Sequence, residues 1–282
     1  MKRLTLYKGQ LSIYLILIIC IIVFMFLLKK CSSPIDKNTH YERAGGDTIN
    51  VAIEISPLSM SLSTDSIEGF YYDILNLISN KYNVNFKFHE FVPLSFAFKG
   101  LDNGNFDIVV ADIPATSELK KKYLLTEPIY IDHQILVQRK DKTSGKGSIT
   151  YYSQLASDSI WVVAGSPFID RISNLSDEMG CDKIFIVESP DYSSEQLIIL
   201  TALGEIKQAV VNANIAKSMI KDYPQLDINT KISFNQFQIW ALDRNNNELC
   251  NKFNHWIREV KKLPEYDELC NKYLNAKNKV RN

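Results

Sequence analysis

The sequence predicts a two-lobed α/β body that is preceded by one transmembrane helix. Residues 11–28 form a run of 18 residues without a charge, and from residue 48 onward alternating and helical hydrophobic patterns follow one another. The composition, 46% hydrophobic and 23% charged, is that of a globular protein and excludes a disordered chain. A body of about 235 residues is long enough for two lobes of roughly 100 residues each.

The charge of the chain is unevenly distributed. The formal net charge is zero, but residues 1–31 hold five bases and no acid, which leaves 27 bases against 32 acids in the rest of the chain. A nucleic-acid-binding protein would carry a basic excess on its folded part, whereas this body is mildly acidic. We therefore expect no nucleic-acid partner, and we expect the basic segment to flank a membrane.

The uncharged run is long enough to cross the hydrocarbon core of a bilayer. It lacks the small residues of a cleavage site, and neither Cys20 nor Cys31 follows the small residue that a lipoprotein signal requires. We expect residues 1–31 to be a cytoplasmic tail and a single-pass signal anchor, while a lipoprotein signal and a cleaved signal stay open. Residues 32–47 are polar and contain Pro, Gly and Ser, which is typical of a linker, and we expect them to tether the body to the membrane segment.

The first half of the body alternates between strands and helices. Hydrophobic residues at every second position predict strands, and those at intervals of three and four predict helices. The expected strands are residues 48–56, 84–92, 106–111 and 130–140, and the expected helices are residues 69–82, 96–101 and 118–124. Residues 141–148 are polar and contain Gly, as a junction would.

The second half repeats this alternation. Ser193 and Gln196 form a capping box that starts one helix, and Gly165-Ser166-Pro167 opens another. The expected strands are residues 159–164, 183–188, 208–212 and 237–242, and further helices cover residues 193–203, 215–221 and the segments around Trp256 and Tyr266. Strands separated by helices predict parallel sheets, with a ligand in the crevice where the strands end.

The order of these motifs resembles the bacterial solute-binding proteins of family 3, which are type II periplasmic binding proteins. It is especially similar to the variants that form the N-terminal domain of a membrane-bound lytic murein transglycosylase. The resemblance spans residues 48–276 in order. The motifs that carry it are INVAIEISPLSM, IEGFYYDILNLISNKYNVNFKF, LDNGNFDIVVADIPATSELKKKYLLTEPIY, VVAGSPFIDRI, SSEQLIILTALGEIKQAVVNANIA and FQIWALDRNNNEL.

The resemblance implies a lobe of residues 48–137 plus 239–282, a lobe of residues 138–238, and hinge strands that let the two close around a ligand. It implies that the body lies on the periplasmic side of the membrane, and that the partners are a small polar solute and the permease of an ABC transporter. A sensor or regulatory module linked to cell-wall metabolism or signalling is the alternative. We expect no enzyme activity, no transglycosylase domain, no cofactor and no metal.

Six residues are candidates for the ligand site. Ser166 lies at a helix N-terminus, where N–H groups favour an anion, although the same serine is also a plausible N-cap. Asp112 follows the third strand. It either accepts a hydrogen bond from an amine or hydroxyl of the ligand, or is an N-cap or solvated acid of a turn. Met60 either lines an adaptable apolar wall of the ligand site or belongs to the hydrophobic core. The remaining candidates are placed by the resemblance: Ser59, Thr116 and Asn212.

Two departures from the family pattern limit the ligand. The family's amino-acid binders carry an Arg for the α-carboxylate after Thr-x-Glu, and Leu119 stands there in this chain. They carry an acid for the α-amino group where this chain has Asn212. A different polar solute, a peptide fragment or a loss of ligand binding therefore stay open. An oxidising compartment would also permit a disulfide between Cys250 and Cys270.

Overall fold

The structure is a computed structural model that describes Leu17 and residues 46–62, 66–91, 94–141, 149, 151–180 and 184–274. The chain divides into a unit of Met1–Tyr41 and a unit of Glu42–Asn282, and the second unit holds the described sheets. Apart from Leu17, the expected anchor and nearly all of the expected tether lie outside the described residues. In the part of the chain that is described, no helix has the length and apolar character needed to cross a bilayer.

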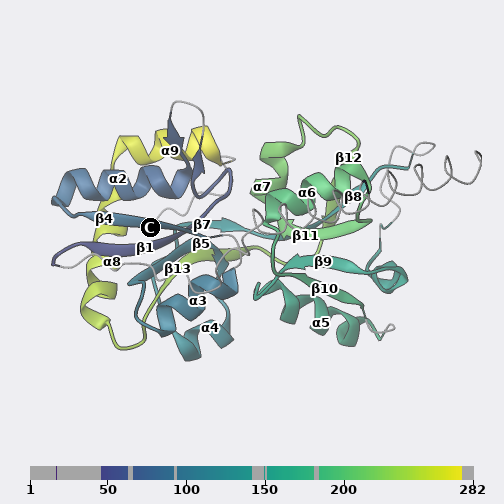
Figure 1. Ribbon diagram of the computed structural model, residues 1–282, viewed down its shortest axis with the longest axis horizontal. Helices are drawn as coiled ribbons and strands as arrows, with labels where there is room; N and C mark the ends of the chain where they lie inside the picture. The colour runs from purple at the N-terminus through teal and green to yellow at the C-terminus, as the bar shows by residue number, and fades with distance from the viewer. Residues whose placement is uncertain are drawn as a thin grey trace, which may run out of the picture. The chain divides into compact units, whose positions relative to one another are not determined.

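The first lobe is built on a sheet of six strands, counted over the described residues (Figure 1). β4, β1, β5, β13 and β6 are neighbours in that order across the sheet, and β7 also pairs with β13. The strands are β1 (Ile49–Glu54), β4 (Phe86–Phe91), β5 (Ile108–Pro114), β6 (Leu124–Leu125), β7 (Tyr130–Asp132) and β13 (Gln236–Leu242). A small hairpin, β2 (Ser61–Leu62) with β3 (Ile67–Glu68), comes after β1.

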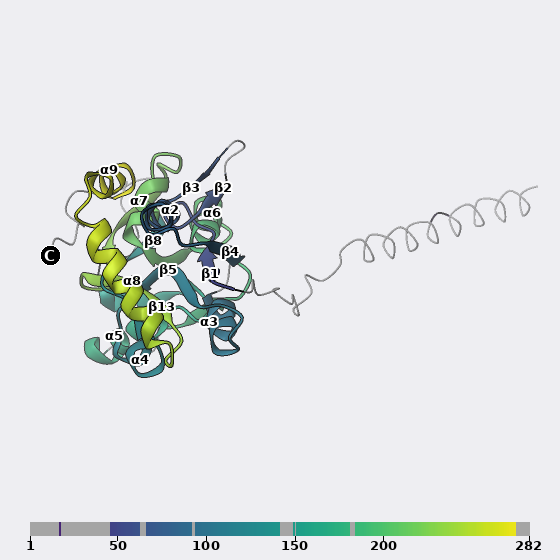
Figure 2. The same cartoon turned by 90° about the vertical axis from the view of Figure 1, so that its left-hand side faces the viewer.

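Helices cover both faces of this sheet. Figure 1 shows α2 and α9 above it and α3 and α4 below it, and Figure 2 shows the same pairs on opposite sides. α2 packs against both α8 and α9, because apolar side chains of all three helices, such as Ile74, Trp256 and Tyr266, share one hydrophobic cluster. The helices are α2 (Phe70–Tyr82), α3 (Leu94–Asp102), α4 (Ser117–Lys122), α8 (Asn247–Val260) and α9 (Pro264–Tyr273).

The second lobe has a five-stranded sheet in the order β10-β9-β11-β8-β12 among the described residues. Figure 1 shows α6 and α7 on one face of this sheet and α5 on the other. The strands are β8 (Gln134–Arg139), β9 (Ile160–Val163), β10 (Ile186–Ser189), β11 (Gln208–Asn212) and β12 (Leu226–Lys231). The helices are α5 (Phe168–Met179), α6 (Ser194–Leu203), α7 (Ala213–Met219) and the short 3₁₀ helix η1 (Tyr152–Ser157).

The chain crosses between the two sheets twice. It leaves the first sheet after Asp132 and enters the second at Gln134, and it returns between Lys231 and Gln236. One hydrophobic cluster runs through this crossing, because Tyr130 of β7 and Ile135 of β8 both belong to it. The two lobes therefore share part of their core.

The sheets correct one expectation from the sequence, because they are mixed rather than parallel. β13 runs antiparallel to β5, and β8 runs antiparallel to β11 and β12. The antiparallel strands β8 and β13 are the ones that follow the two crossings between the lobes, so each sheet receives one strand of opposite direction there. The strand expected over residues 130–140 is divided at His133 into β7 and β8. The sequence pattern does not predict β12, because the second half of this strand, residues 229–231, is polar and partly exposed.

The sequence leaves open a disulfide between Cys250 and Cys270, and the structure does not form it. Both cysteines are buried, one in α8 and the other in α9. The Cys250 Sγ lies against the first sheet, 3.8 Å from the carbonyl oxygen of Leu125, and the Asn254 amide donates to it at 3.7 Å. Cys20, Cys31 and Cys181 lie outside the described residues.

Candidate functional site

Strand ends from both sheets meet where the lobes join. β1 and β5 are parallel neighbours, so their carboxyl ends, near Glu54 and Asp112, lie at one edge of the first sheet. β11 of the second sheet ends at Asn212. We call this region, together with Asp132 at the first crossing, the lobe boundary. In α/β folds ligands bind beyond such strand ends.

Asp112 is the centre of the lobe boundary. The sequence predicts it just after the third strand, but the structure places it inside β5, which continues to Pro114. Its side chain is 7% exposed, and Oδ1 accepts hydrogen bonds from the hydroxyls of Tyr71 at 2.7 Å and Tyr130 at 2.5 Å. Burial raises the pKa of both tyrosines well above the ordinary value, so both hydroxyls keep their protons. Burial also raises the pKa of Asp112, although the two hydroxyl bonds counteract this rise. Its Oδ2 has no hydrogen-bond donor among the described residues.

Glu54 lies beside Asp112 and is equally enclosed. Burial, reinforced by the negative charge of Asp112, raises the pKa of Glu54 to about 8, so that this carboxyl is mostly protonated at neutral pH. The Ser59 hydroxyl donates to Glu54 Oε2 at 3.4 Å, and the Ser59 amide donates to the Ser56 hydroxyl at 3.0 Å. Ser59 is therefore buried and reaches the lobe boundary through Glu54.

Asn212 connects the two lobes directly. Its side-chain Nδ2 donates to the backbone carbonyl of Asp112 at 3.3 Å, and its Oδ1 accepts from Gln134 Nε2 at 3.2 Å. Asn212 is 2% exposed. The structure thus brings together two of the residues that the sequence singled out, although they are 100 positions apart in the chain.

Asp132 adds a third enclosed acid at the crossing. Burial raises its pKa to about 7, and the Asn214 amide, which donates to Oδ2 at 3.0 Å, limits the rise. Its Oδ1 has no hydrogen-bond donor among the described residues and lies 3.7 Å from the His133 ring nitrogen. The lobe boundary therefore holds three enclosed carboxyl groups, whose oxygens are hydrogen-bond acceptors.

Ser166 binds the start of a helix within the second lobe. Its hydroxyl accepts from the Phe168 amide at 3.2 Å, and its carbonyl accepts from the Ile169 amide, so Ser166 binds the first amides of α5 although Pro167 is the N-cap residue. The preceding Gly165 has a φ of +72° and lies against Ser95 of the first lobe, because a Cβ on Gly165 would come within 2.9 Å of the Ser95 Cβ. This loop is a second contact between the lobes.

Thr116 and Met60 also have local structural roles. The Thr116 hydroxyl accepts from the Leu119 amide at 3.2 Å and caps α4. Met60 is 2% exposed and belongs to the core, so it fits the core interpretation rather than that of a pocket wall. Leu119, where the family pattern has a carboxylate-binding Arg, has an apolar side chain that is 9% exposed.

Sequence reasoning missed several residues of the lobe boundary. Tyr71 and Tyr130 fit the hydrophobic patterns of a helix and a strand, and that pattern cannot reveal that their hydroxyls meet at one carboxylate. Glu54 did carry a signal, since an acid at the end of an otherwise apolar strand occupies the same kind of position as Asp112.

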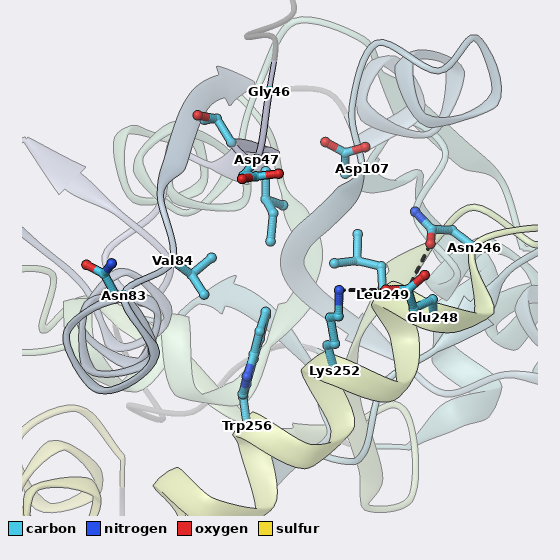
Figure 3. A pocket seen from close by; sticks show the side chains of 12 residues that line it. Gly46, Asp47, Asn83, Val84, Asp107, Asn246, Glu248, Leu249, Lys252 and Trp256 are labelled. Atoms are coloured by element: carbon cyan, nitrogen blue, oxygen red, sulfur yellow. Dashed lines mark hydrogen bonds and ion pairs between the residues drawn. The ribbon is translucent and has the colours of Figure 1, made fainter.

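A separate pocket of about 440 Å³ lies at the other end of the first-lobe strands (Figure 3). It is lined by the residues before and at the start of β1, by Asp107 just before β5, and by one side of α8. Figure 3 shows Lys252 paired with Glu248, which the structure places 2.7 Å apart, and the Trp256 ring on the same helix. The Asp107 carboxylate accepts from the Asn50 amide at 2.8 Å. Strand starts line this pocket, so it is distinct from the lobe boundary.

Within the described part of the chain, no group of three His, Cys, Asp or Glu side chains is arranged to hold a metal ion. The acids of the lobe boundary are instead enclosed by tyrosine, serine and amide groups. The arrangement suits an organic solute that brings hydrogen-bond donors.

Comparison with known proteins agrees with this geometry. The family model of bacterial extracellular solute-binding proteins, family 3, matches residues 48–276. Membrane-bound lytic murein transglycosylase F of Shewanella woodyi is 22% identical over 180 residues, which is 64% of this chain and 36% of that protein. The same enzyme of Alteromonas mediterranea is 24% identical over 241 residues, covering 84% of this chain and 50% of that protein. The chain thus spans at most about half the length of these relatives.

Solved structures share the two-lobed fold. An ancestral arginine-binding protein bound to arginine has a TM-score of 0.70 and 21% identity, covering 82% of this chain and 99% of that chain. A putative L-cystine ABC transporter protein from Listeria monocytogenes has a TM-score of 0.72 and 17% identity, covering 83% of this chain and 99% of that chain. At these identities the likeness concerns the fold.

Proposed function

Because this chain belongs to the bacterial extracellular solute-binding proteins of family 3, we propose that it closes two lobes around a small polar solute, either amino-acid-like or peptide-like. The observation that carries the proposal is the contact between Asp112 and Asn212, which joins strand ends of the two sheets at a buried polar boundary. A solute bound there would touch both lobes and would favour the closed state. The sequence predicts lobes of residues 48–137 with 239–282, and of residues 138–238. Because β8 belongs wholly to the second sheet and β13 wholly to the first, we propose that the lobes divide near His133 and between Lys231 and Gln236.

We propose further that the protein is held outside the cytoplasmic membrane by residues 11–28 and passes its solute to the permease of an ABC transporter. The length of the uncharged run and the family support this assignment. N-terminal sequencing of the protein from a membrane fraction tests the anchor. A mature N-terminus after residue 31 would replace the anchor with a cleaved or lipidated signal.

A second candidate is a sensor or regulatory module linked to cell-wall metabolism or signalling. It is favoured by the relatives named as murein transglycosylases and by Leu119, which removes the expected partner of a free amino acid's carboxylate. In this case the solute would be a cell-wall fragment, or the boundary would have lost its solute.

One experiment separates these candidates. The full chain, kept in mild detergent, is screened by thermal shift against amino acids, short peptides and muropeptides. A stabilising amino acid or peptide supports transport, and a stabilising muropeptide supports the cell-wall role. Asp112→Ala and Ser166→Ala are tested beside it. If no solute raises the melting temperature, and neither variant differs from the unmodified protein in its thermal-shift response, the proposal of solute binding at the lobe boundary is wrong.

A further inference from the structure

We infer that the solute of the lobe boundary is an organic cation that carries an ammonium or guanidinium group and lacks a carboxylate. The inference rests on the proposed function and specifies its ligand. Two independent features support it, which are the enclosed acids of the boundary and the occupied anion loop of the second lobe.

The enclosed acids have no Lys or Arg partner within the described part of the chain, and the His133 ring lies 3.7 Å from Asp132. No Lys or Arg described there forms an ion pair with Glu54, Asp112 or Asp132. Asp112 is 7% exposed and Asp132 is 1% exposed. Burying a charge without a partner is costly, and a cation from outside the chain would supply that partner.

Asp112 is arranged to accept a further donor. The hydroxyls of Tyr71 and Tyr130 both bind Oδ1 and fix the orientation of the carboxylate. Oδ2 is left without a donor in the described part of the chain, as is Oδ1 of Asp132. An ammonium has three N–H donors and a guanidinium has five, so either cation satisfies these buried oxygens.

The anion loop of the second lobe, residues 165–168, already uses its backbone N–H donors within the protein. The Gly165 amide donates to the protein's own Glu188 Oε2 at 3.3 Å, and the Ser166 amide donates to the Val163 carbonyl at 3.1 Å. The Phe168 amide is bound by Ser166 Oγ. A solute carboxylate at this loop would have to displace these bonds and would meet the negative charge of Glu188.

The corresponding place in the first lobe is also unsuited to a carboxylate. Leu119 contributes an apolar side chain, and the Leu119 amide is already bound by the Thr116 hydroxyl. Both places where the family resemblance put carboxylate recognition are therefore closed to an anion, while the acids between them favour a cation.

The test uses pairs of solutes that differ only in a carboxylate. Agmatine is compared with arginine, and 1,5-diaminopentane with lysine, by titration calorimetry on the full chain in detergent. We expect the amine to bind at least tenfold more tightly than the amino acid in at least one pair. Asp112→Asn, which keeps an acceptor for the tyrosines, should weaken that amine by about tenfold to a hundredfold. Glu248→Gln, which removes an acid of the separate pocket, should leave binding unchanged.

A second variant does not disturb the buried acids. Glu188 is exposed, so Glu188→Gln keeps the fold and removes the negative charge beside Gly165. It should reduce the preference for agmatine over arginine by improving arginine. Arginine binding as tightly as agmatine in the unmodified chain overturns the cation inference and leaves two-lobed solute binding intact. No binding of any probe, together with no stabilising solute in the wider screen, overturns both.

Discussion

Glu54 is a residue whose protonation is coupled to folding. Its pKa rises from 4.5 to about 8 because the folded chain buries it beside Asp112. Between those pH values the unfolded chain releases this proton and the folded chain keeps it, so the free energy of unfolding decreases as pH rises. Asp112 and Asp132 act in the same direction, since burial raises the pKa of both, whereas burial lowers the pKa of His89 and His133.

We predict that Glu54→Gln flattens this pH dependence. Gln fills the same space and can accept the bond from Ser59, but it never ionises. Relative to the unmodified protein, the variant should gain stability as pH rises from 4.5 to 8, by on the order of 3 to 5 kcal/mol at the upper end. Urea unfolding at a series of pH values measures this difference. A constant difference across that range would contradict the prediction.

Gly165 is required for the lobes to approach each other. A Cβ there would lie 2.9 Å from the Ser95 Cβ and 3.1 Å from the Ser95 backbone nitrogen. Gly165→Ala should therefore separate the lobes, and hydrogen exchange followed by mass spectrometry should show faster exchange near Ser95. Gly180→Ala is the matched control, since Gly180 also has a positive φ, +58°, but has open space around its Cβ position. If both variants speed hydrogen exchange near Ser95 equally, backbone strain at the glycine, and not the clash with Ser95, explains the faster exchange.

The residues of the site differ in how well the sequence reveals them. Asn212 ends β11 and Asp112 lies close to the end of β5, so the hydrophobic pattern alone predicts their place near a sheet edge. Their mutual contact cannot be predicted in this way, because it depends on how two lobes meet. Ser166 lies just before a helix as predicted, and the structure makes Thr116 the N-cap of α4. A sequence motif for an anion loop cannot reveal that Glu188, 23 positions away, already binds that loop.

Among the elements, α6 follows its sequence signals closely. Ser193 and Gln196 predict a capping box, and the structure confirms it with a 2.8 Å bond from the Ser193 amide to the Gln196 side chain and a 3.3 Å bond in return. By contrast, the pattern predicts one strand where the structure has β7 and β8. A hydrophobic pattern reports that residues are buried but not in which sheet, so a crossing between sheets leaves no mark on it.

We predict that Ser193→Ala lowers the free energy of unfolding by about 1 kcal/mol, because the Gln196 amide at the start of α6 loses its acceptor. Ser193→Asp is the matched control, since aspartate also caps helices and should retain nearly all of the stability. Urea unfolding of the three proteins under one set of conditions measures the effect. If the alanine and aspartate variants lose the same amount, the cap does not stabilise α6.

At the scale of the whole folded unit, the two lobes are joined by a short crossing and by a few polar contacts. The shared hydrophobic cluster at Tyr130 and Ile135 holds the crossing together, while the contacts of Asn212 and Gly165 lie between opposing strand ends and loops. A hinge with this arrangement can open by changing few bonds. The equilibrium between open and closed lobes is then sensitive to a free energy as small as that of one hydrogen bond.

We predict that removing one such bond shifts the lobes toward an open state even without a solute. Asn212→Ala loses the donor to the Asp112 carbonyl, and a net hydrogen bond contributes about 0.5 to 1.5 kcal/mol, so the open population should rise about twofold to tenfold. Spin labels on unnatural residues at Lys99 and Asp170, both exposed, report the distance between α3 and α5. Asn229→Ala is the control, because Asn229 bonds to Asp227 within the second lobe. If Asn212→Ala leaves the distance distribution the same as Asn229→Ala does, the Asn212 contact does not hold the lobes, and closure depends on the crossing and the solute alone.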